Sequence, residues 1–166
     1  MARTSYAIAL GSNRPGRHGG PEREIAAALA ALGSVSAVSP IFRTAPLGPS
    51  FRRFANAAAI VESDEQPPAL LRRLKRIERS FGRRRGRIWG ARVIDLDIIL
   101  WSGGSWGEPG LTIPHPAFRA RGFVLLPLAR IASDWRDPVT RLSIRQLLAR
   151  LTRPVPTPRG GRTVGP

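Results

Sequence analysis

The chain has 166 residues and a mass of 18.1 kDa, the size of one domain with a single core. It contains no cysteine, which excludes disulfides, thiolate zinc sites and cysteine nucleophiles. No apolar run approaches the roughly 18 residues that a membrane helix needs, and the N-terminus shows no signal-peptide pattern. We therefore expect a cytoplasmic protein that does not enter membranes.

The net charge is +16, from 27 basic and 11 acidic residues, and Lys75 is the only lysine. Such a charge favours polyanionic partners: nucleic acid, phosphorylated small molecules or anionic membrane surfaces. Genome base composition can also produce this arginine bias, so the charge alone is a weak indication of function.

The first third of the chain alternates strand, helix and strand. Residues 6–10 are predicted to form a buried strand, and Pro21 opens a helix that Gly33 ends. The apolar positions of this helix share one face: Ile25, Leu29 and Leu32. Alternation over residues 34–42 predicts another strand.

In the middle third, a loop over 44–53 precedes a predicted strand at 54–62, and Pro67 and Pro68 start a helix. The stripe of this helix has helical spacing: Leu70, Leu74, Ile77 and Phe81. A basic, glycine-containing loop follows at 82–91.

The last third begins with the clearest strand, 93–100, followed by a turn region at 102–110 and an extended piece at 111–116. The apolar segment 123–131 fits either a helix or a strand. Ser143 and Gln146 form a capping box that starts a helix through Leu151. Residues 154–166 are rich in proline and glycine and are predicted to be a disordered tail after a single domain over 1–153.

The order strand–helix–strand–strand–helix–strand is that of an α+β, ferredoxin-like sandwich, an antiparallel sheet with helices packed on it. Within the clearest strand, Asp95 and Asp97 point to one side, because side chains alternate between the faces. The other side should face the core: Ile94, Leu96, Ile98 and Leu100. Two adjacent carboxylates on a rigid strand suit Mg²⁺ together with substrate phosphates. The alternative is a solvent-facing strand edge.

Several arginines lie just before or beside this strand: Arg83, Arg84, Arg85, Arg87 and Arg92. Their planar guanidinium groups suit phosphate oxygens, and cations beside metal-binding carboxylates are what phosphoryl transfer requires. A solvated basic loop is the alternative.

Three further features could complete a ligand site. His115 stands between two prolines and could donate to a phosphate, although a lone histidine is more often structural. Phe54 and Phe123 could stack on a flat heteroaromatic ligand, or could simply pack in the core. Asn56 offers a donor and an acceptor at fixed spacing.

An ordered series of short motifs resembles the 6-hydroxymethyl-7,8-dihydropterin pyrophosphokinase family. The motifs occupy residues 9–13, 43–49, 54–57, 89–97, 113–116 and 121–128. The resemblance implies a ferredoxin-like fold and an ATP-dependent transfer of pyrophosphate to the hydroxymethyl group of a reduced pterin in folate biosynthesis, releasing AMP. It also implies ATP as co-substrate and two Mg²⁺ ions.

The same resemblance assigns site residues. Asp95 and Asp97 would bind the metal ions, and Arg83 and Arg92 would be catalytic cations. The pterin would contact Thr44, Leu47, Phe54, Asn56, Trp89 and Phe123. The nucleotide would contact Lys75, Glu78, Arg85, Trp89, Ile98, Thr112, His115 and Arg121.

The chain departs from the family pattern at Ala45, Ile88, Ala91 and Gly110, which puts loop behaviour and ATP affinity in doubt while leaving the aspartates untouched. A nucleotidyltransferase is a weaker alternative, because Gly11-Ser12 lies more than eighty residues before the aspartates. A non-enzymatic basic RNA-binding protein does not account for an aspartate pair on an apolar strand. We expect a monomer that binds nucleic acid at most non-specifically.

Overall fold

A five-stranded sheet forms the centre of the computed structural model, which describes residues 2–44, 54–82 and 92–156. Its strands are β1 (Thr4–Ser12), β2 (Val35–Val38), β3 (Phe42–Thr44), β4 (Phe54–Ser63) and β5 (Asp95–Trp101). The order is β2–β4–β1–β5, β3 also pairs with β4, and every pair is antiparallel. The predicted ferredoxin-like α+β sandwich is confirmed.

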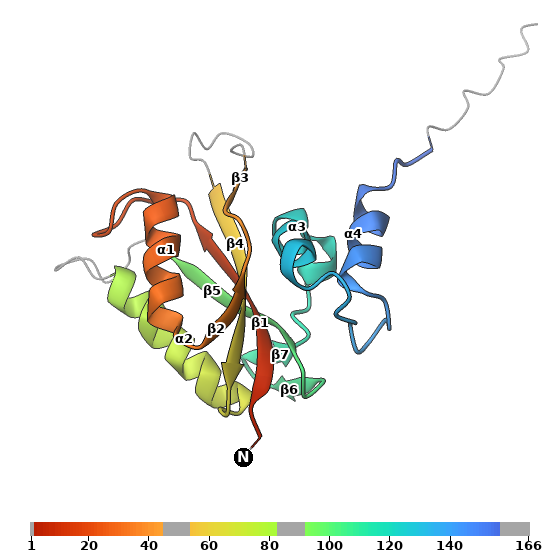
Figure 1. The fold of residues 1–166 in the computed structure, drawn as a ribbon, viewed down its shortest axis with the longest axis horizontal. Helices are drawn as coiled ribbons and strands as arrows, with labels where there is room; N and C mark the ends of the chain where they lie inside the picture. Colours follow the sequence, from red (N-terminus) through yellow and green to blue (C-terminus); the bar gives the residue numbers. More distant parts are fainter. Residues whose placement is uncertain (1, 45–53, 83–91, 157–166) are drawn as a thin grey trace, which may run out of the picture.

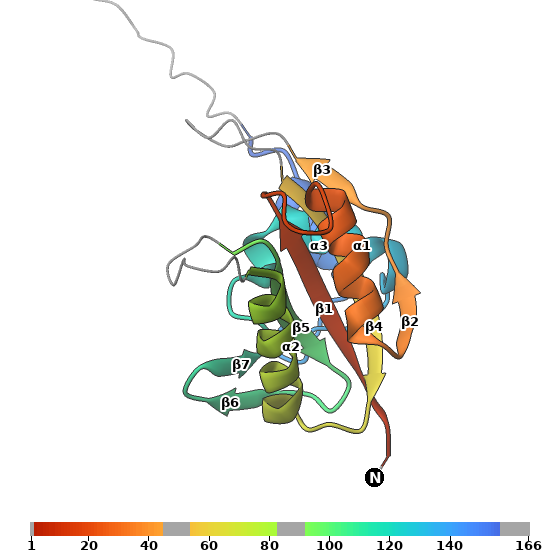
Figure 2. The same cartoon turned by 90° about the vertical axis from the view of Figure 1, so that its left-hand side faces the viewer.

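Helices cover both faces of this sheet (Figures 1 and 2). One face carries α1 (Pro21–Leu32) and α2 (Pro67–Gly82), and the opposite face carries α3 (Gly122–Ile131) and α4 (Ile144–Thr152). A short hairpin of β6 (Trp106–Glu108) and β7 (Leu111–Ile113) and a 3-10 turn, η1 (Phe118–Ala120), connect β5 to α3. No helix in the described part of the chain is long and apolar enough to cross a membrane.

Two hydrophobic cores lie on the two sides of the sheet. The first core packs Leu70, Leu74 and Phe81 of α2 and Ile25 of α1 against the sheet, as the predicted stripes require. The second core joins α3 and α4 to the sheet. Fully burying one such side chain contributes about 1.5–3 kcal/mol. The helices therefore hold the sheet from both sides.

A bulge in β5 overturns one prediction about its faces. Ile8 pairs with Ile98 but Ala7 pairs with Leu100, so Ile99 is an extra residue in the strand. This shifts the alternation by one position. Leu100 therefore lies with Ile99 in the second core, and the prediction that it shares a face with Leu96 and Ile98 is wrong.

The predicted strand over 34–42 is two strands, β2 and β3. They are separated around Pro40, which has no N–H to donate to a ladder. Ser39 replaces the missing pairing, because its N–H donates to Ala58 O at 2.9 Å and its hydroxyl accepts from Ala58 N at 2.9 Å. The break lets the chain reach β4 twice, once on each side of Pro40.

The later segments follow the sequence pattern closely. The apolar segment 123–131 is helical, as part of α3. The capping box is confirmed: Ser143 Oγ accepts from Gln146 N at 3.2 Å, and Gln146 Oε1 accepts from Ser143 N at 2.9 Å. The turn region at 102–110 contains β6, and the extended piece at 111–116 contains β7. Residues 154–156 are exposed coil, and the rest of the predicted tail lies outside the described residues.

Candidate functional site

One row of residues crosses three strands at the end of the sheet. Gly11 of β1 pairs with Asn56 of β4 on one side and with Asp95 of β5 on the other. Residues directly opposite in a ladder share a face, so the Asn56 and Asp95 side chains stand on the same face, two strand spacings apart, roughly 10 Å. Between them Gly11 offers no side chain. The row therefore brings an amide and a carboxylate to one face of the sheet, with a glycine between them.

The next row of paired residues lies on the same face of the sheet. Ala9 of β1 pairs with Ala58 of β4 and with Asp97 of β5. Ala9 and Ala58 are both small; Ala58 is buried and Ala9 is partly buried. The face is the one that α3 and α4 cover farther along the sheet, and both alanines pack against the second core. The predicted common face of Asp95 and Asp97 is confirmed by this register.

Asp95 lies in an environment that disfavours its charge. Burial raises the pKa of Asp95, and the neighbouring carboxylates of Glu78 and Asp97 raise it further, while Arg92 and Lys75 act in the opposite direction. A carboxylate with too little compensating positive charge is suited to a cation. The Asp95 side chain is 59% exposed, so its carboxylate is accessible to a cation.

The donor set fits Mg²⁺ held jointly with a phosphorylated ligand. The described residues contain no group of three or more His, Cys, Asp or Glu side chains that could enclose a metal alone. Asp95 and Asp97 therefore offer two carboxylates, and substrate phosphates and water would supply the other ligands. Mg²⁺ commonly binds in this way, through one or two carboxylates.

Glu78 of α2 organises the edge of β5. Its side chain is 5% exposed, and its Oε1 accepts a hydrogen bond from Leu96 N at 2.8 Å. Its Oε2 lies 3.1 Å from Lys75 Nζ and 3.7 Å from an Arg92 guanidinium nitrogen. Glu78 was expected to contact a nucleotide, but in the structure both of its oxygens are engaged by protein groups.

Arg92 connects this edge to the aspartates. A guanidinium nitrogen lies 3.8 Å from Asp95 Oδ1, and the side chain remains 62% exposed. Because Arg92 and Asp95 are both solvent-accessible, their ion pair is weak and can be exchanged for a ligand. Arg92 is thus free to turn toward a phosphate.

His115 is held with one nitrogen available. The backbone N–H of His115 donates to Ile99 O at 3.0 Å, and the ring Nδ1 accepts from Ala117 N at 3.2 Å. Burial lowers the pKa of His115; the charge of Asp97 opposes this, and the charge of Arg121 lowers the pKa further. The neutral ring therefore carries its proton on Nε2, which can donate to a ligand.

Two aromatic rings of the predicted pterin site are partly open to solvent. Phe54 opens β4 opposite Thr44 of β3 and is 36% exposed, and Phe123 near the start of α3 is 43% exposed. The Arg121 guanidinium lies 5.6 Å from the Phe123 ring centre. Both rings are therefore accessible to a ligand.

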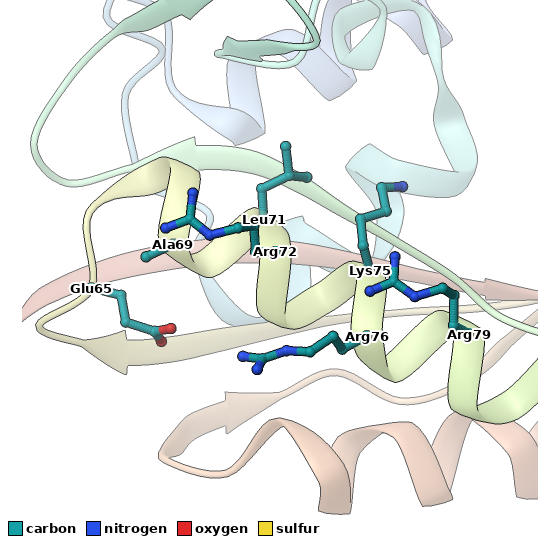
Figure 3. Close-up of a pocket in the computed structure, with 7 residues that line it drawn as sticks. All are labelled: Glu65, Ala69, Leu71, Arg72, Lys75, Arg76 and Arg79. Atoms are coloured by element: carbon teal, nitrogen blue, oxygen red, sulfur yellow. The ribbon is translucent and has the colours of Figure 1, made fainter.

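Lys75 lines a hollow of about 480 Å³ on the outer side of α2 (Figure 3). Sequence reasoning missed the other lining residues: Glu65, Ala69, Leu71, Arg72, Arg76 and Arg79. Their spacing of three and four residues on a helix was the signal that could have found them. Leu71, Lys75 and Arg79 rise from one side of the helix in Figure 3.

Other predicted nucleotide contacts are dispersed. Thr112 lines a second hollow of about 530 Å³ with Trp106 and Pro116. The Ile98 side chain is 4% exposed and belongs to the first core, which leaves almost none of it for a ligand. Four predicted site residues lie outside the described part of the chain: Leu47, Arg83, Arg85 and Trp89.

Comparison of the sequence with known proteins identifies a matching family. The model of the family described as 7,8-dihydro-6-hydroxymethylpterin-pyrophosphokinase (HPPK) matches residues 7–133. A protein of Pseudomonas aeruginosa named 2-amino-4-hydroxy-6-hydroxymethyldihydropteridine pyrophosphokinase is 40% identical over 148 residues, covering 86% of this chain and 88% of its own length. The protein of the same name from Haemophilus influenzae is 41% identical over 137 residues, covering 79% and 82%.

Other matches are longer than this chain. The protein of that name from Synechocystis is 40% identical over 121 residues, which cover 73% of this chain and 62% of that protein. A crystal structure described as HPPK-DHPS in complex with substrates matches with a TM-score of 0.71 and 13% identity, over 90% of this chain and 45% of that chain. The likeness to this crystal structure concerns the fold alone. The comparisons give no support to a non-enzymatic RNA-binding protein. From the family model and these relatives, the chain belongs to the 7,8-dihydro-6-hydroxymethylpterin-pyrophosphokinase family.

Proposed function

We propose that this chain transfers the β,γ-pyrophosphoryl group of ATP to the hydroxymethyl group of 6-hydroxymethyl-7,8-dihydropterin, a step of folate biosynthesis. The hydroxymethyl oxygen forms a bond to the β-phosphorus, the bond from that phosphorus to the α,β-bridging oxygen breaks, and AMP leaves. The hydroxyl proton is released. The observation on which the proposal depends is the row Asn56–Gly11–Asp95, because it brings an amide and a carboxylate to one face of the sheet with a glycine between them.

Asp95 and Asp97 are proposed to hold two Mg²⁺ ions together with the triphosphate. When bound, such ions neutralise phosphate charge and orient the reacting groups. The protein's own contribution is to keep the two carboxylates on a rigid strand whose edge Glu78 fastens through Leu96 N. Pre-set carboxylates reduce the reorganisation needed during the reaction.

Cations beside the carboxylates are proposed to bind and stabilise the phosphates. Arg92 lies near both Asp95 and Glu78, and a triphosphate can replace its exposed pair with Asp95. His115 presents Nε2–H as a neutral donor, and Arg121 adds a positive charge near it. On the family resemblance we propose Arg83 as a second catalytic cation, and Lys75, Arg85, Trp89 and Thr112 as further nucleotide contacts. The resemblance also names Glu78 and Ile98, but their buried side chains leave little for a nucleotide to contact.

The pterin is proposed to lie over the row Asn56–Gly11–Asp95. Asn56 would hydrogen-bond the edge of the pterin ring, and Phe54 and Phe123 would stack on its faces, which accounts for their exposure. The resemblance adds Thr44, Leu47 and Trp89. Because Asn56 lies two strands from Asp95, a ring held by Asn56 would be within reach of a phosphate bound at the aspartates.

We further propose that the protein is a cytoplasmic monomer. Its charge of +16 would then produce only non-specific attraction to nucleic acid. A steep loss of RNA binding as salt rises, with no sequence preference, is the expected behaviour. High-affinity binding to a defined RNA would contradict this part of the proposal.

The decisive experiment is AMP formation from ATP and Mg²⁺, with and without 6-hydroxymethyl-7,8-dihydropterin. We expect AMP only when the pterin is present, in equal amount to the pyrophosphorylated pterin. Pterin without the hydroxymethyl group is the control and should give none. AMP formation that ignores the pterin, or its absence in all mixtures, would overturn the proposed function.

A further inference from the structure

A wholly buried carboxylate lies outside the site described above. Glu24, in the first turn of α1, has no exposed surface. Its Oε1 accepts from His18 N at 2.7 Å, and its Oε2 lies 2.9 Å from His18 Nδ1. Among the described residues, His18 is the one basic side chain within ion-pair distance of Glu24. Leaving a buried carboxylate unpaired is strongly unfavourable, so Glu24 holds His18 firmly.

Because of this pair, residues 16–19 form a tight turn against the domain. Gly16 and Gly19 exchange backbone hydrogen bonds of 2.9 and 3.2 Å, and His18 lies at the tip between them. The His18 ring packs on Phe81, with 4.7 Å between ring centres. Phe81 lies one turn after Glu78 on α2, so the turn contacts the helix that fastens the edge of β5.

The same turn also contacts the residues that lead into β5. A Cβ on Gly16 would stand 2.7 Å from both Glu24 Oε1 and Val93 Cγ1, so the backbone of Gly16 fills the space between these two side chains. Ser12 Oγ, at the end of β1, donates to Val93 O at 2.7 Å. Val93 stands two residues before Asp95 and directly after Arg92.

We propose that His18 and Glu24 are a positioning pair for pyrophosphoryl transfer. They hold the turn at residues 16–19 against Val93 and Phe81, and thereby set where Arg92 and Asp95 stand relative to the sheet. The pair touches no substrate and acts through Gly16 and Val93. This inference rests on the proposed function but assigns residues that neither the family resemblance nor the site geometry had included.

The physical reason for an effect on catalysis is the position of Asp95 at the first residue of an edge strand. Beyond its pairing with Gly11, the segment before it is held by Ser12 and by the turn. Without the His18 ring, Glu24 Oε2 must find water or another donor, and the turn must rearrange to admit it. A displacement of about 1 Å at a reacting group can lower turnover by a factor on the order of a hundred.

The test compares His18→Ala with His18→Asn, because the asparagine amide can place an N–H donor where Nδ1 stands. We expect His18→Ala to lower kcat by about tenfold or more while the affinity for a non-hydrolysable MgATP analogue changes much less. His18→Asn should restore most of the loss. Glu22→Gln is the matched control: it removes an exposed carboxylate from the same helical turn and should leave kcat unchanged.

A second readout does not depend on activity. In the protein without nucleotide, His18→Ala should move the backbone amide resonances of Val93, Asp95 and Leu96, and His18→Asn should move them less. Glu22→Gln should leave them in place. If the native chain forms no AMP, the proposed function fails, whereas these resonances still report on the positioning.

Gly16→Ala disturbs the same contact and leaves His18 in place, since the added Cβ collides with Val93 and Glu24. It should lower kcat in the same way. A His18→Ala variant with native kcat and native amide resonances would overturn the proposal, and so would equal losses in His18→Ala and His18→Asn.

Discussion

The Asn56 side chain lies close above Gly11. A Cβ built on Gly11 would stand 3.2 Å from Asn56 Oδ1, closer than ordinary van der Waals contact. Gly11 is thus needed for the space above it, since its backbone does not adopt a left-handed conformation in this structure. This relationship ties a residue of β1 to the proposed pterin contact on β4.

Gly11→Ala should therefore weaken pterin binding more than nucleotide binding. Asn56 must move by a few tenths of an ångström to admit the methyl group, which would also project toward the bound pterin ring. We expect the pterin Kd to rise about tenfold, or roughly 1.4 kcal/mol. Calorimetric titration in the presence of a non-hydrolysable MgATP analogue measures this. An unchanged pterin Kd would remove Asn56 and Gly11 from the site.

Asp95→Asn and Asp97→Asn should each lower turnover by at least about a hundredfold, the size expected for one key electrostatic group. The fold should survive. Burial raises the pKa of Asp95, so its ionised form opposes folding above the ordinary carboxyl pKa. Asp95→Asn should accordingly leave the Tm of the metal-free protein at neutral pH unchanged or raised. Near-native pyrophosphoryl transfer by Asp97→Asn would show that the metal assignment is wrong.

Arg92→Ala should reduce turnover more than it reduces nucleotide affinity. Arg92 is mostly exposed and only weakly paired in the free protein, so its strongest contact is expected with the reacting phosphates. Arg84→Ala is the charge-matched control, because the family resemblance assigns Arg84 no role, and it should be nearly silent. If both variants lose the same activity, general basicity rather than position is responsible.

The His115 ring should titrate below the ordinary histidine pKa of 6.5. Burial is the main cause, and Arg121 contributes in the same direction. Arg121→Gln should therefore raise the pKa of His115. An NMR pH titration of the imidazole resonances, with His18 as the second signal in the spectrum, tests both statements. A His115 pKa above 6.5 in the native protein would contradict the neutral-donor role.

Acid should unfold the α3–α4 side of the protein through Asp137. Burial alone raises the pKa of Asp137, but hydrogen bonds from Arg119, Thr140 and Val139 outweigh it and lower the pKa to about 2. A depressed carboxyl pKa gives stability that is complete above about pH 4 and is lost as pH falls toward 2. The contribution is about 2 kcal/mol.

Urea unfolding of Asp137→Asn and of the native chain checks this contribution. The difference in unfolding free energy should be large at pH 6 and should shrink at pH 3. The exposed Asp134, which pairs with Arg145, supplies the control variant Asp134→Asn, with a small effect at both pH values. A constant difference across this range would contradict the low pKa of Asp137.

The sequence was sufficient wherever local pattern and local chemistry agree. The stripe at Leu70, Leu74 and Phe81 required a helix over one face, and the Ser143 capping box marked the start of α4. The alternation around Asp95 and Asp97 predicted their common face. Short-range geometry decides such features, so residue spacing alone contains the information.

Only the tertiary structure decided which distant residues meet. The bulge at Ile99 moved Leu100 to the other core, which no periodicity indicates, because a bulge depends on the partner strand. The pairing of Gly11 with both Asn56 and Asp95 joins three segments through long-range register. Likewise, no sequence pattern marks Glu24 as a buried residue. Its burial against His18 arises because the turn, α2 and the start of β5 converge there, and sequence spacing cannot specify that convergence.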